Sequence, residues 1–168
     1  YLSGSITLPA SLTSIGTHAF HFCSSLTSVS FESGSQLTTI DYEAFKSSGL
    51  SGSITLPASL TIIGRNAFYD CSSLTSVNFH ELILLQTIGN DAFFRSGLSG
   101  SITLPASLTS IKGNSFQYSS LTSVNFESGS QLATIDMYAF YESGLTSITF
   151  PASLTSIGIS VFENCYSL

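Results

Sequence analysis

The chain has 168 residues, enough for one ordinary domain, and 43% of them are hydrophobic, enough to fill a core. Only 8% are charged, and the net charge of −6 with four basic residues disfavours nucleic acid or an anionic membrane surface as a partner. No apolar run approaches the roughly 20 residues that a transmembrane helix requires.

From the N-terminus onward the dominant feature is a repeat. The twelve residues LSGSITLPASLT at 2–13 return unchanged at 50–61 and 98–109, a period of 48. Each period holds two shorter units, and every unit has the same order of apolar anchors, starting with the leucine of an L-x-x-I step. These leucines, 22 to 25 residues apart, are Leu12, Leu37, Leu60, Leu85, Leu108, Leu132 and Leu154. Units of this length, stacked one coil per unit, are typical of a leucine-rich-repeat solenoid.

The expected elements follow a fixed order within each unit. Segments such as SVSF at 28–31 and SITL at 53–56 alternate polar and apolar residues, which predicts short strands stacked in register as a parallel sheet. The L-x-x-I segment predicts a second face of short strands or turns, and the Ala-Phe step after it predicts a single helical or 3₁₀ turn. Every second unit carries one extra residue around Gly52, so length varies in loops while the anchors keep their places. The phenylalanines of the Ala-Phe step should stack as an internal spine: Phe20, Phe45, Phe68, Phe93, Phe116, Phe140 and Phe162.

The pattern in ITLPASLTSIGTHAFHFCSS at 6–25 closely resembles BspA-like (Treponema-type) leucine-rich repeats, and it recurs seven times over the whole chain. The resemblance implies a leucine-rich-repeat arc of about seven coils of 22–25 residues, mostly strand and loop, with a parallel β-sheet on the concave face. It also implies a secreted or surface-anchored protein associated with adhesion, without catalytic residues. We expect residues 1–168 to form a single solenoid that is a fragment of a longer array.

Cysteine and histidine are the obvious metal-ligand or redox candidates. Cys23, Cys71 and Cys165 share one repeat position, which predicts small buried side chains with reduced thiols. Cys23 and Cys71 lie two rungs apart, about 9.6 Å at a strand spacing of about 4.8 Å. A disulfide requires Cα atoms within roughly 7 Å of each other, so these two cysteines are too far apart to form one. His18 and His21 lie three residues apart without an evident third ligand, so we interpret them as surface polar residues. The sequence predicts no metal site and no cofactor.

Paired carboxylates are equally unpromising for catalysis. Glu32 and Glu127 share a repeat position but lie four rungs apart, about 19 Å on the strand spacing. Glycoside chemistry needs roughly 5–9.5 Å between its two carboxyl groups. The sequence therefore predicts a protein that is not an enzyme.

The strand residues between the anchors offer a binding surface instead, because they face outward. We hypothesise that two columns of small polar side chains bind a protein or glycan ligand on a matrix or cell surface, with many weak contacts acting together. One column is Ser28, Ser53, Ser76, Ser101, Ser123 and Ser147. The other is Ser30, Thr55, Asn78, Thr103, Asn125 and Thr149.

Two alternatives to adhesion stay open at this point. Duplication of an unchanged block also suits a structural spacer or filament segment, which would self-associate end to end or laterally. The hydroxyl columns would also suit ice or crystal-lattice binding, although Ser and Asn interrupt the Thr rows.

One loop breaks the repeat. Aligned units read FESGSQL at 31–37 and 126–132, but FHELILL at 79–85, so Leu82, Ile83 and Leu84 replace polar loop residues. Two explanations compete. Either loss of glycine shifts the backbone and tucks these side chains against the core, or they form an exposed apolar patch that docks a partner or a second copy of the chain.

Overall fold

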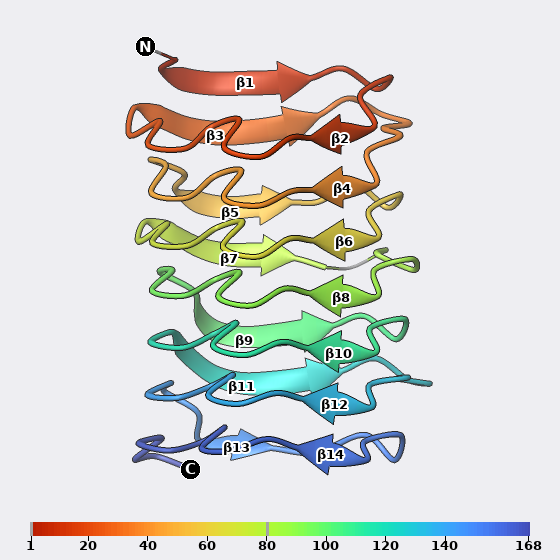
Figure 1. Cartoon of the computed structure of the whole chain (residues 1–168), viewed down its shortest axis with the longest axis vertical. Helices are drawn as coiled ribbons and strands as arrows, with labels where there is room; N and C mark the ends of the chain where they lie inside the picture. The colour runs from red at the N-terminus through yellow and green to blue at the C-terminus, as the bar shows by residue number, and fades with distance from the viewer. Residues whose placement is uncertain (1, 80) are drawn as a thin grey trace.

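The structure, a computed structural model, describes residues 2–79 and 81–168, which wind as a parallel β-solenoid of stacked coils (Figure 1). Each coil holds one long and one short strand. The long strands are β1 (Gly4–Leu8), β3 (Leu26–Phe31), β5 (Gly52–Thr55), β7 (Leu74–Asn78), β9 (Ser99–Leu104), β11 (Ser120–Phe126) and the shortened β13 (Ser147–Ile148). The short strands are β2 (Ser14–Ile15), β4 (Thr39–Ile40), β6 (Ile62–Ile63), β8 (Thr87–Ile88), β10 (Ser110–Ile111), β12 (Thr134–Ile135) and β14 (Ser156–Ile157). Across these two ranges no helix is long and apolar enough to cross a bilayer.

The short strands form one continuous parallel sheet of seven, in the order β14-β12-β10-β8-β6-β4-β2. Each presents an isoleucine from the L-x-x-I step, and Ile15, Ile40 and Ile63 lie opposite one another in register. All three isoleucines are buried. A β-branched side chain is favoured in a strand that has one buried and one solvent-exposed face. The second face predicted from the sequence is therefore confirmed as strand.

The long strands do not form the single sheet that we expected. They divide into β1-β3, β5-β7 and β9-β11-β13. Each break comes directly before a strand, β5 or β9, whose unit carries the extra residue. In β5 it makes a bulge, with a register shift between Gly52 and Ser53 and a left-handed φ of 68° at Gly52, which glycine tolerates without a Cβ clash. β13 comes from a unit that lacks this residue (Gly144-Leu145-Thr146-Ser147), and it pairs with β11 without interruption.

The phenylalanine spine is confirmed. Successive rings from Phe20 to Phe162 stack with centroids 5.0 to 5.8 Å apart and planes within 8° of parallel. The five inner rings are fully buried, and the two end rings are partly buried. Because each phenylalanine removes on the order of 150–250 Å² from water, this spine is the main apolar seam between coils.

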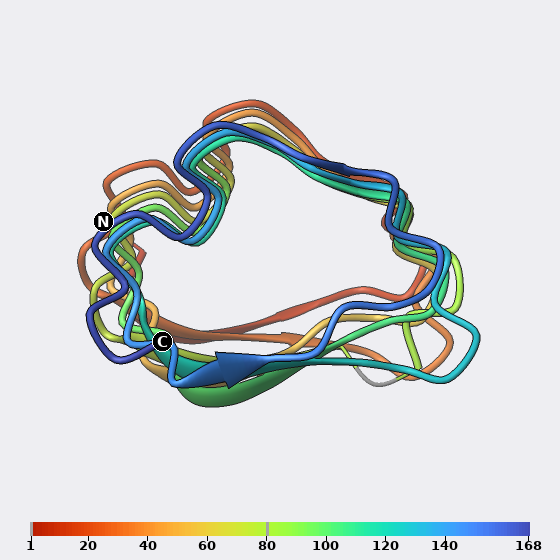
Figure 2. The same cartoon turned by 90° about the horizontal axis from the view of Figure 1, so that it is seen from below.

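The Ala-Phe step forms neither a helical nor a 3₁₀ turn. His18 and Phe22 adopt left-handed φ values of 59° and 55°, and equivalent residues do so in every later coil. Along this segment every second backbone N–H donates a hydrogen bond to a carbonyl of the next coil. The N–H groups of the residues between them donate to the carbonyl three residues earlier in the same coil. In the first coil the N–H groups of His18, Phe20 and Phe22 donate to the carbonyls of Tyr42, Ala44 and Lys46, at 3.0, 2.7 and 2.9 Å. We call residues 16–25 and the equivalent segments the turn edge, which appears as a folded ribbon at the left of Figure 2.

Candidate functional site

The structure places the two polar columns on the outer face of the long strands, as the strand pattern predicted. Eleven of the twelve side chains are exposed and Ser123 is half-buried. The columns are in register within each sheet; for example, Ser53 lies opposite Ser76 and Thr55 opposite Asn78. Neighbouring members also bond to one another, since Ser123 and Asn125 both donate to the Ser101 hydroxyl, at 2.9 and 2.8 Å. The result is a polar surface without charged groups in either column.

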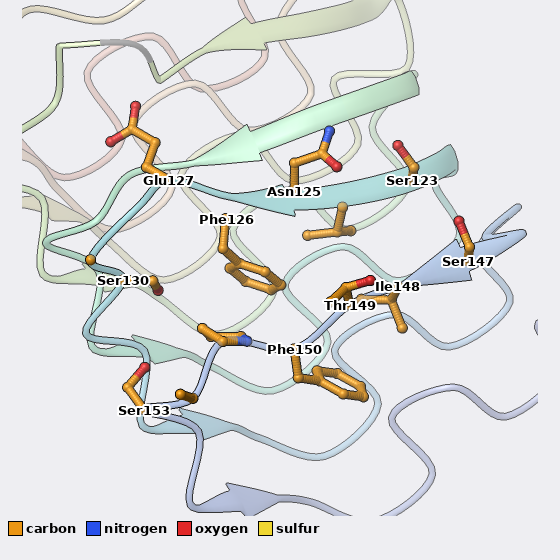
Figure 3. A pocket seen from close by; sticks show the side chains of 14 residues that line it. Ser123, Asn125, Phe126, Glu127, Ser130, Ser147, Ile148, Thr149, Phe150 and Ser153 are labelled. Atoms are coloured by element: carbon orange, nitrogen blue, oxygen red, sulfur yellow. The ribbon is translucent and has the colours of Figure 1, made fainter.

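An open groove of ≈ 460 Å³ lies between β11 and β13 on this face (Figure 3). Ser123, Asn125 and Ser147 line its polar rim, and the rings of Phe126 and Phe150 form its apolar side. Comparable grooves open farther up the same face. The lining combines hydroxyl and amide groups with the two phenylalanine rings, which suits contact with an extended segment of mixed polarity.

The carboxylates of Glu32 and Glu127 accept hydrogen bonds from backbone N–H groups and do not form a reactive pair. Each accepts a hydrogen bond from the N–H of an alanine in the preceding coil, Ala10 at 2.9 Å and Ala106 at 3.1 Å. A carboxylate that accepts a backbone N–H in this way stabilises the loop that follows a long strand.

The cysteines are free, as predicted. Cys71 and Cys165 are buried and donate to carbonyls of the preceding coil at 3.1 Å, whereas Cys23 is half-buried. Burial raises the pKa of the Cys71 thiol to about 11 despite hydrogen bonding with Ser48. A thiol with such a pKa is neutral at physiological pH and is a poor nucleophile or metal ligand.

The apolar loop at 79–85 follows neither explanation completely. Leu82 is only 1% exposed, whereas Ile83 and Leu84 are 74% and 49% exposed. Without glycine, the left-handed residue becomes Glu81 (φ 77°), and the turn closes one residue earlier through the Leu82 N–H to the Phe79 carbonyl at 3.1 Å. That shift turns Leu82 into the core and leaves the other two outside. His80 lies outside the described residues.

The turn edge carries a row of aromatic side chains that sequence reasoning missed. We call Tyr69, Phe94, Arg95, Tyr118, Tyr138 and Tyr141 the aromatic edge. Tyr69 stacks on Phe94 with centroids 4.7 Å apart, and Phe94, Tyr118 and Tyr141 continue the row edge to face at 5.3 and 5.8 Å. The Arg95 guanidinium lies 5.4 Å from the centroid of Phe94 and 5.3 Å from that of Tyr118. The sequence does contain a sign of this row, because the position directly after a spine phenylalanine is aromatic in three units, at Tyr69, Phe94 and Tyr141.

The lower end of the aromatic edge is hollowed. A shallow depression of ≈ 370 Å³ lies there, lined by three tyrosines together with Asn114, Gln117 and Glu163. Hydrogen bonding with Glu142 raises the pKa of Tyr141, so its hydroxyl remains a neutral donor and acceptor. The edge thus combines fixed aromatic faces with polar tips.

Three side chains with metal-ligand chemistry meet at the upper end of the turn edge. No third ligand is evident near His18 and His21 in the sequence, but the structure places Glu43 of the next coil beside both. Its Oε2 lies 3.2 Å from Nε2 of His18 and 3.7 Å from Nε2 of His21. Burial alone would raise the pKa of Glu43, but hydrogen bonds from Lys46, Asn66 and Tyr42 lower it to about 2. We call His18, His21 and Glu43 the histidine cluster.

Comparison with known proteins identifies the repeat. A family model described as a BspA-type leucine-rich repeat region, in six copies, matches residues 3–99 and 38–168. The structure superposes on the pneumococcal vaccine antigen PcpA with a TM-score of 0.76 and 27% identity, covering 96% of this chain and 48% of that one. It also superposes on a leucine-rich cell surface protein from Faecalibacterium prausnitzii A2-165, with a TM-score of 0.54, 27% identity, and 100% and 38% coverage. The chain therefore spans less than half the length of either solved protein. A comparison with curated proteins found no match.

Proposed function

Because this chain belongs to the BspA-type leucine-rich-repeat family, we propose that it is a cell-surface binding module that attaches to a protein ligand. Solenoids of this kind typically serve as binding scaffolds rather than catalysts, since their stacked coils present long continuous surfaces. The two similar structures are described as a vaccine antigen and a cell surface protein, which supports the proposed location.

The observation that carries the proposal is the aromatic edge. Tyrosine and arginine are among the residues most enriched at the energetic centres of protein interfaces. Here Arg95 is held between Phe94 and Tyr118, and the ring stacking already restricts the rotamers of these side chains. Their conformational entropy is thus largely lost before binding, which favours affinity.

The two polar columns supply a second, weaker contact surface in this proposal. Ser, Thr and Asn side chains gain little from burial, so each rung contributes modestly and several rungs must act together. Thr55 and Thr103 lie at the middle of this face and are both exposed. They are suitable positions for testing the columns separately from the aromatic edge.

The test is an array of matrix proteins and glycans probed with three purified chains: the wild type, Tyr118→Ser/Tyr141→Ser, and Thr55→Lys/Thr103→Lys. We expect the wild type to bind at least one protein, the tyrosine variant to bind it at least about 10-fold more weakly, and the threonine variant to change affinity by less than about 3-fold. Melting temperatures confirm that the variants are folded.

Each other outcome overturns a defined part of the proposal. Binding lost only in the threonine variant would move the site to the polar columns. Signals on glycans alone would replace the protein ligand with a carbohydrate. No binding by any chain across the array would favour a spacer that displays other parts of the protein.

A further inference from the structure

We propose that His18, His21 and Glu43 bind one divalent transition-metal ion, with Zn²⁺ the best match to the ligand set. Two imidazoles and one carboxylate form a known protein ligand set for zinc with an open fourth position. Hard cations such as Ca²⁺ and Mg²⁺ prefer all-oxygen sites, so the histidines disfavour them.

The distances fit a tetrahedral ion. With metal–ligand bonds of about 2.0–2.1 Å, tetrahedral ligand atoms lie about 3.4 Å apart. Glu43 Oε2 is 3.2 and 3.7 Å from the two Nε2 atoms, and one ligand atom from each side chain can be chosen so that all three lie within 4.8 Å of one another. The imidazole rings stack with planes 25° apart, and the Nε2 atoms of both rings lie near the same carboxylate oxygen. Movements of a few tenths of an ångström at Glu43 and a closure of at most about 1.4 Å between the histidine nitrogens would complete the site.

Two of the three groups that hydrogen-bond the Glu43 carboxylate bind its Oε1 rather than its Oε2. Lys46 Nζ and Asn66 Nδ2 both donate to Oε1 of Glu43, at 2.9 and 3.0 Å, whereas Oε2 faces the histidines. Glu43 is 5% exposed, so the second coil fixes it firmly. Outer-sphere hydrogen bonds of this kind hold a metal ligand in position before the ion arrives.

His21 provides an independent sign of a missing ligand. Its Nε2 is buried yet has no hydrogen-bond partner among the described residues. A buried polar nitrogen without a partner carries a desolvation cost that a metal bond would remove. The His18 side chain is 49% exposed, so an ion can enter from solvent and keep one coordination position for water.

The backbone brings these ligands together across two coils. His18 and Glu43 occupy the same repeat position, both with left-handed φ, and the ladder bond from the His18 N–H to Tyr42 joins their turns at 3.0 Å. Other coils repeat the position without the set; Asp91 there bonds to Asn114 at 3.0 Å. A bound ion would therefore tie the first two coils together and nowhere else in the described part of the chain.

The experiment is calorimetric titration of the tag-free chain with ZnCl₂, with melting temperature as a second readout. We expect saturable 1:1 binding, a melting temperature raised by at least about 3 °C, and affinity at least about 10-fold lower in His18→Ala and Glu43→Gln. Asp91→Asn is the matched control and should bind like the wild type. His18→Ala tests the site even if Glu43→Gln unfolds, because His18 is half-exposed.

Spectroscopy distinguishes a metal ion bound by the histidine cluster from one bound by a cysteine thiol. Co²⁺ held by nitrogen and oxygen shows no intense thiolate charge-transfer band, and Cys23→Ser should bind with unchanged affinity. Wild-type affinity no greater than that of His18→Ala, or equal losses in Asp91→Asn, would overturn the proposal. Binding lost in Cys23→Ser would assign the ion to the thiol instead.

Discussion

Phe45 and Phe68 stack nearly parallel across adjacent coils, with ring centroids 5.2 Å apart and planes 8° apart. Both rings are fully buried, and each contacts a spine neighbour on its other face as well. A coil of about 24 residues cannot bury such a ring alone, so the two coils depend on each other for stability.

Removal of one spine ring should therefore be among the most destabilising single changes. We expect Phe68→Ala to lower the free energy of unfolding by about 3–5 kcal/mol, because it opens a cavity that both neighbouring coils line. Phe22→Ala is the matched control, since Phe22 is 68% exposed, and it should change stability by less than about 0.5 kcal/mol. Urea denaturation followed by circular dichroism measures both. Equal effects of the two changes would contradict the spine as the main seam.

Close backbone packing makes a second prediction, at Gly49. A methyl group built there would overlap the carbonyl oxygen of Ser24 in the preceding coil, and a backbone carbonyl cannot rotate away. We expect Gly49→Ala to lower the free energy of unfolding by about 3 kcal/mol. Gly16→Ala meets open space at an ordinary φ and should be tolerated. A Gly49→Ala chain as stable as the wild type would show that the two coils are separated more widely.

Acid should expose the contribution of Glu43. Its pKa in the folded chain is about 2, below the ordinary value of 4.5, so its contribution is present above about pH 4.5 and is lost as the pH falls toward 2. We expect the free energy of unfolding of the wild type to exceed that of Glu43→Gln by up to about 3 kcal/mol at pH 7 in metal-free buffer. The difference should shrink steadily below pH 4.5. A difference that stays constant down to pH 2.5 would exclude the charge of Glu43 as its source.

The residues of the apolar loop have two different roles, which one single and one double variant can distinguish. Leu82→Ala should cost about 2–4 kcal/mol of stability, because that side chain lies in the core. Ile83→Ser/Leu84→Ser should leave the melting temperature nearly unchanged. If Ile83 and Leu84 dock a second copy of the chain, sedimentation velocity will show less self-association in the double variant. The same sedimentation profile for wild type and double variant would remove these two residues from any self-association surface.

Thiol reactivity tests the burial of the cysteines. We expect one thiol, that of Cys23, to react readily with an aromatic disulfide reagent at pH 8 in the native chain, and all three in denaturant. Cys71 should react only on the time scale of opening, because burial raises its thiol pKa to about 11. Rapid reaction of two or more native thiols would indicate that the stack opens locally.

The sequence predicted the features that each unit specifies by itself. The inward anchors, the outward polar columns and the spine follow from side-chain alternation and a constant repeat length, so they needed no knowledge of neighbouring coils. The division of the long-strand face was less accessible. An extra glycine was visible at Gly52, but only the paired backbone shows that it becomes a bulge and that β5 does not continue the sheet of β3.

Contacts between particular side chains of the turn edge were the part that the sequence did not reveal. His21 and Glu43 are 22 positions apart, and their meeting depends on the exact turn geometry and on the loop lengths between them. Tyr69 and Phe94 stack for the same reason. The left-handed residues of the turn edge could have been suspected from Asn66 and Asn114, because asparagine adopts positive φ more readily than most residues.

The ladder of hydrogen bonds along the turn edge also determines how the molecule would respond to tension. Each coil is joined to the next by the short-strand bonds and by three turn-edge bonds that lie along the stack, such as those from His18, Phe20 and Phe22. A pull on the chain ends would load one end coil at a time, and these bonds would open as in a zipper. Every detached coil would lengthen the tether by about 80 Å when extended, at about 3.4 Å per residue. Under tension a stack of such coils would therefore unfold stepwise, one coil at a time, and lengthen while the remaining coils stay folded.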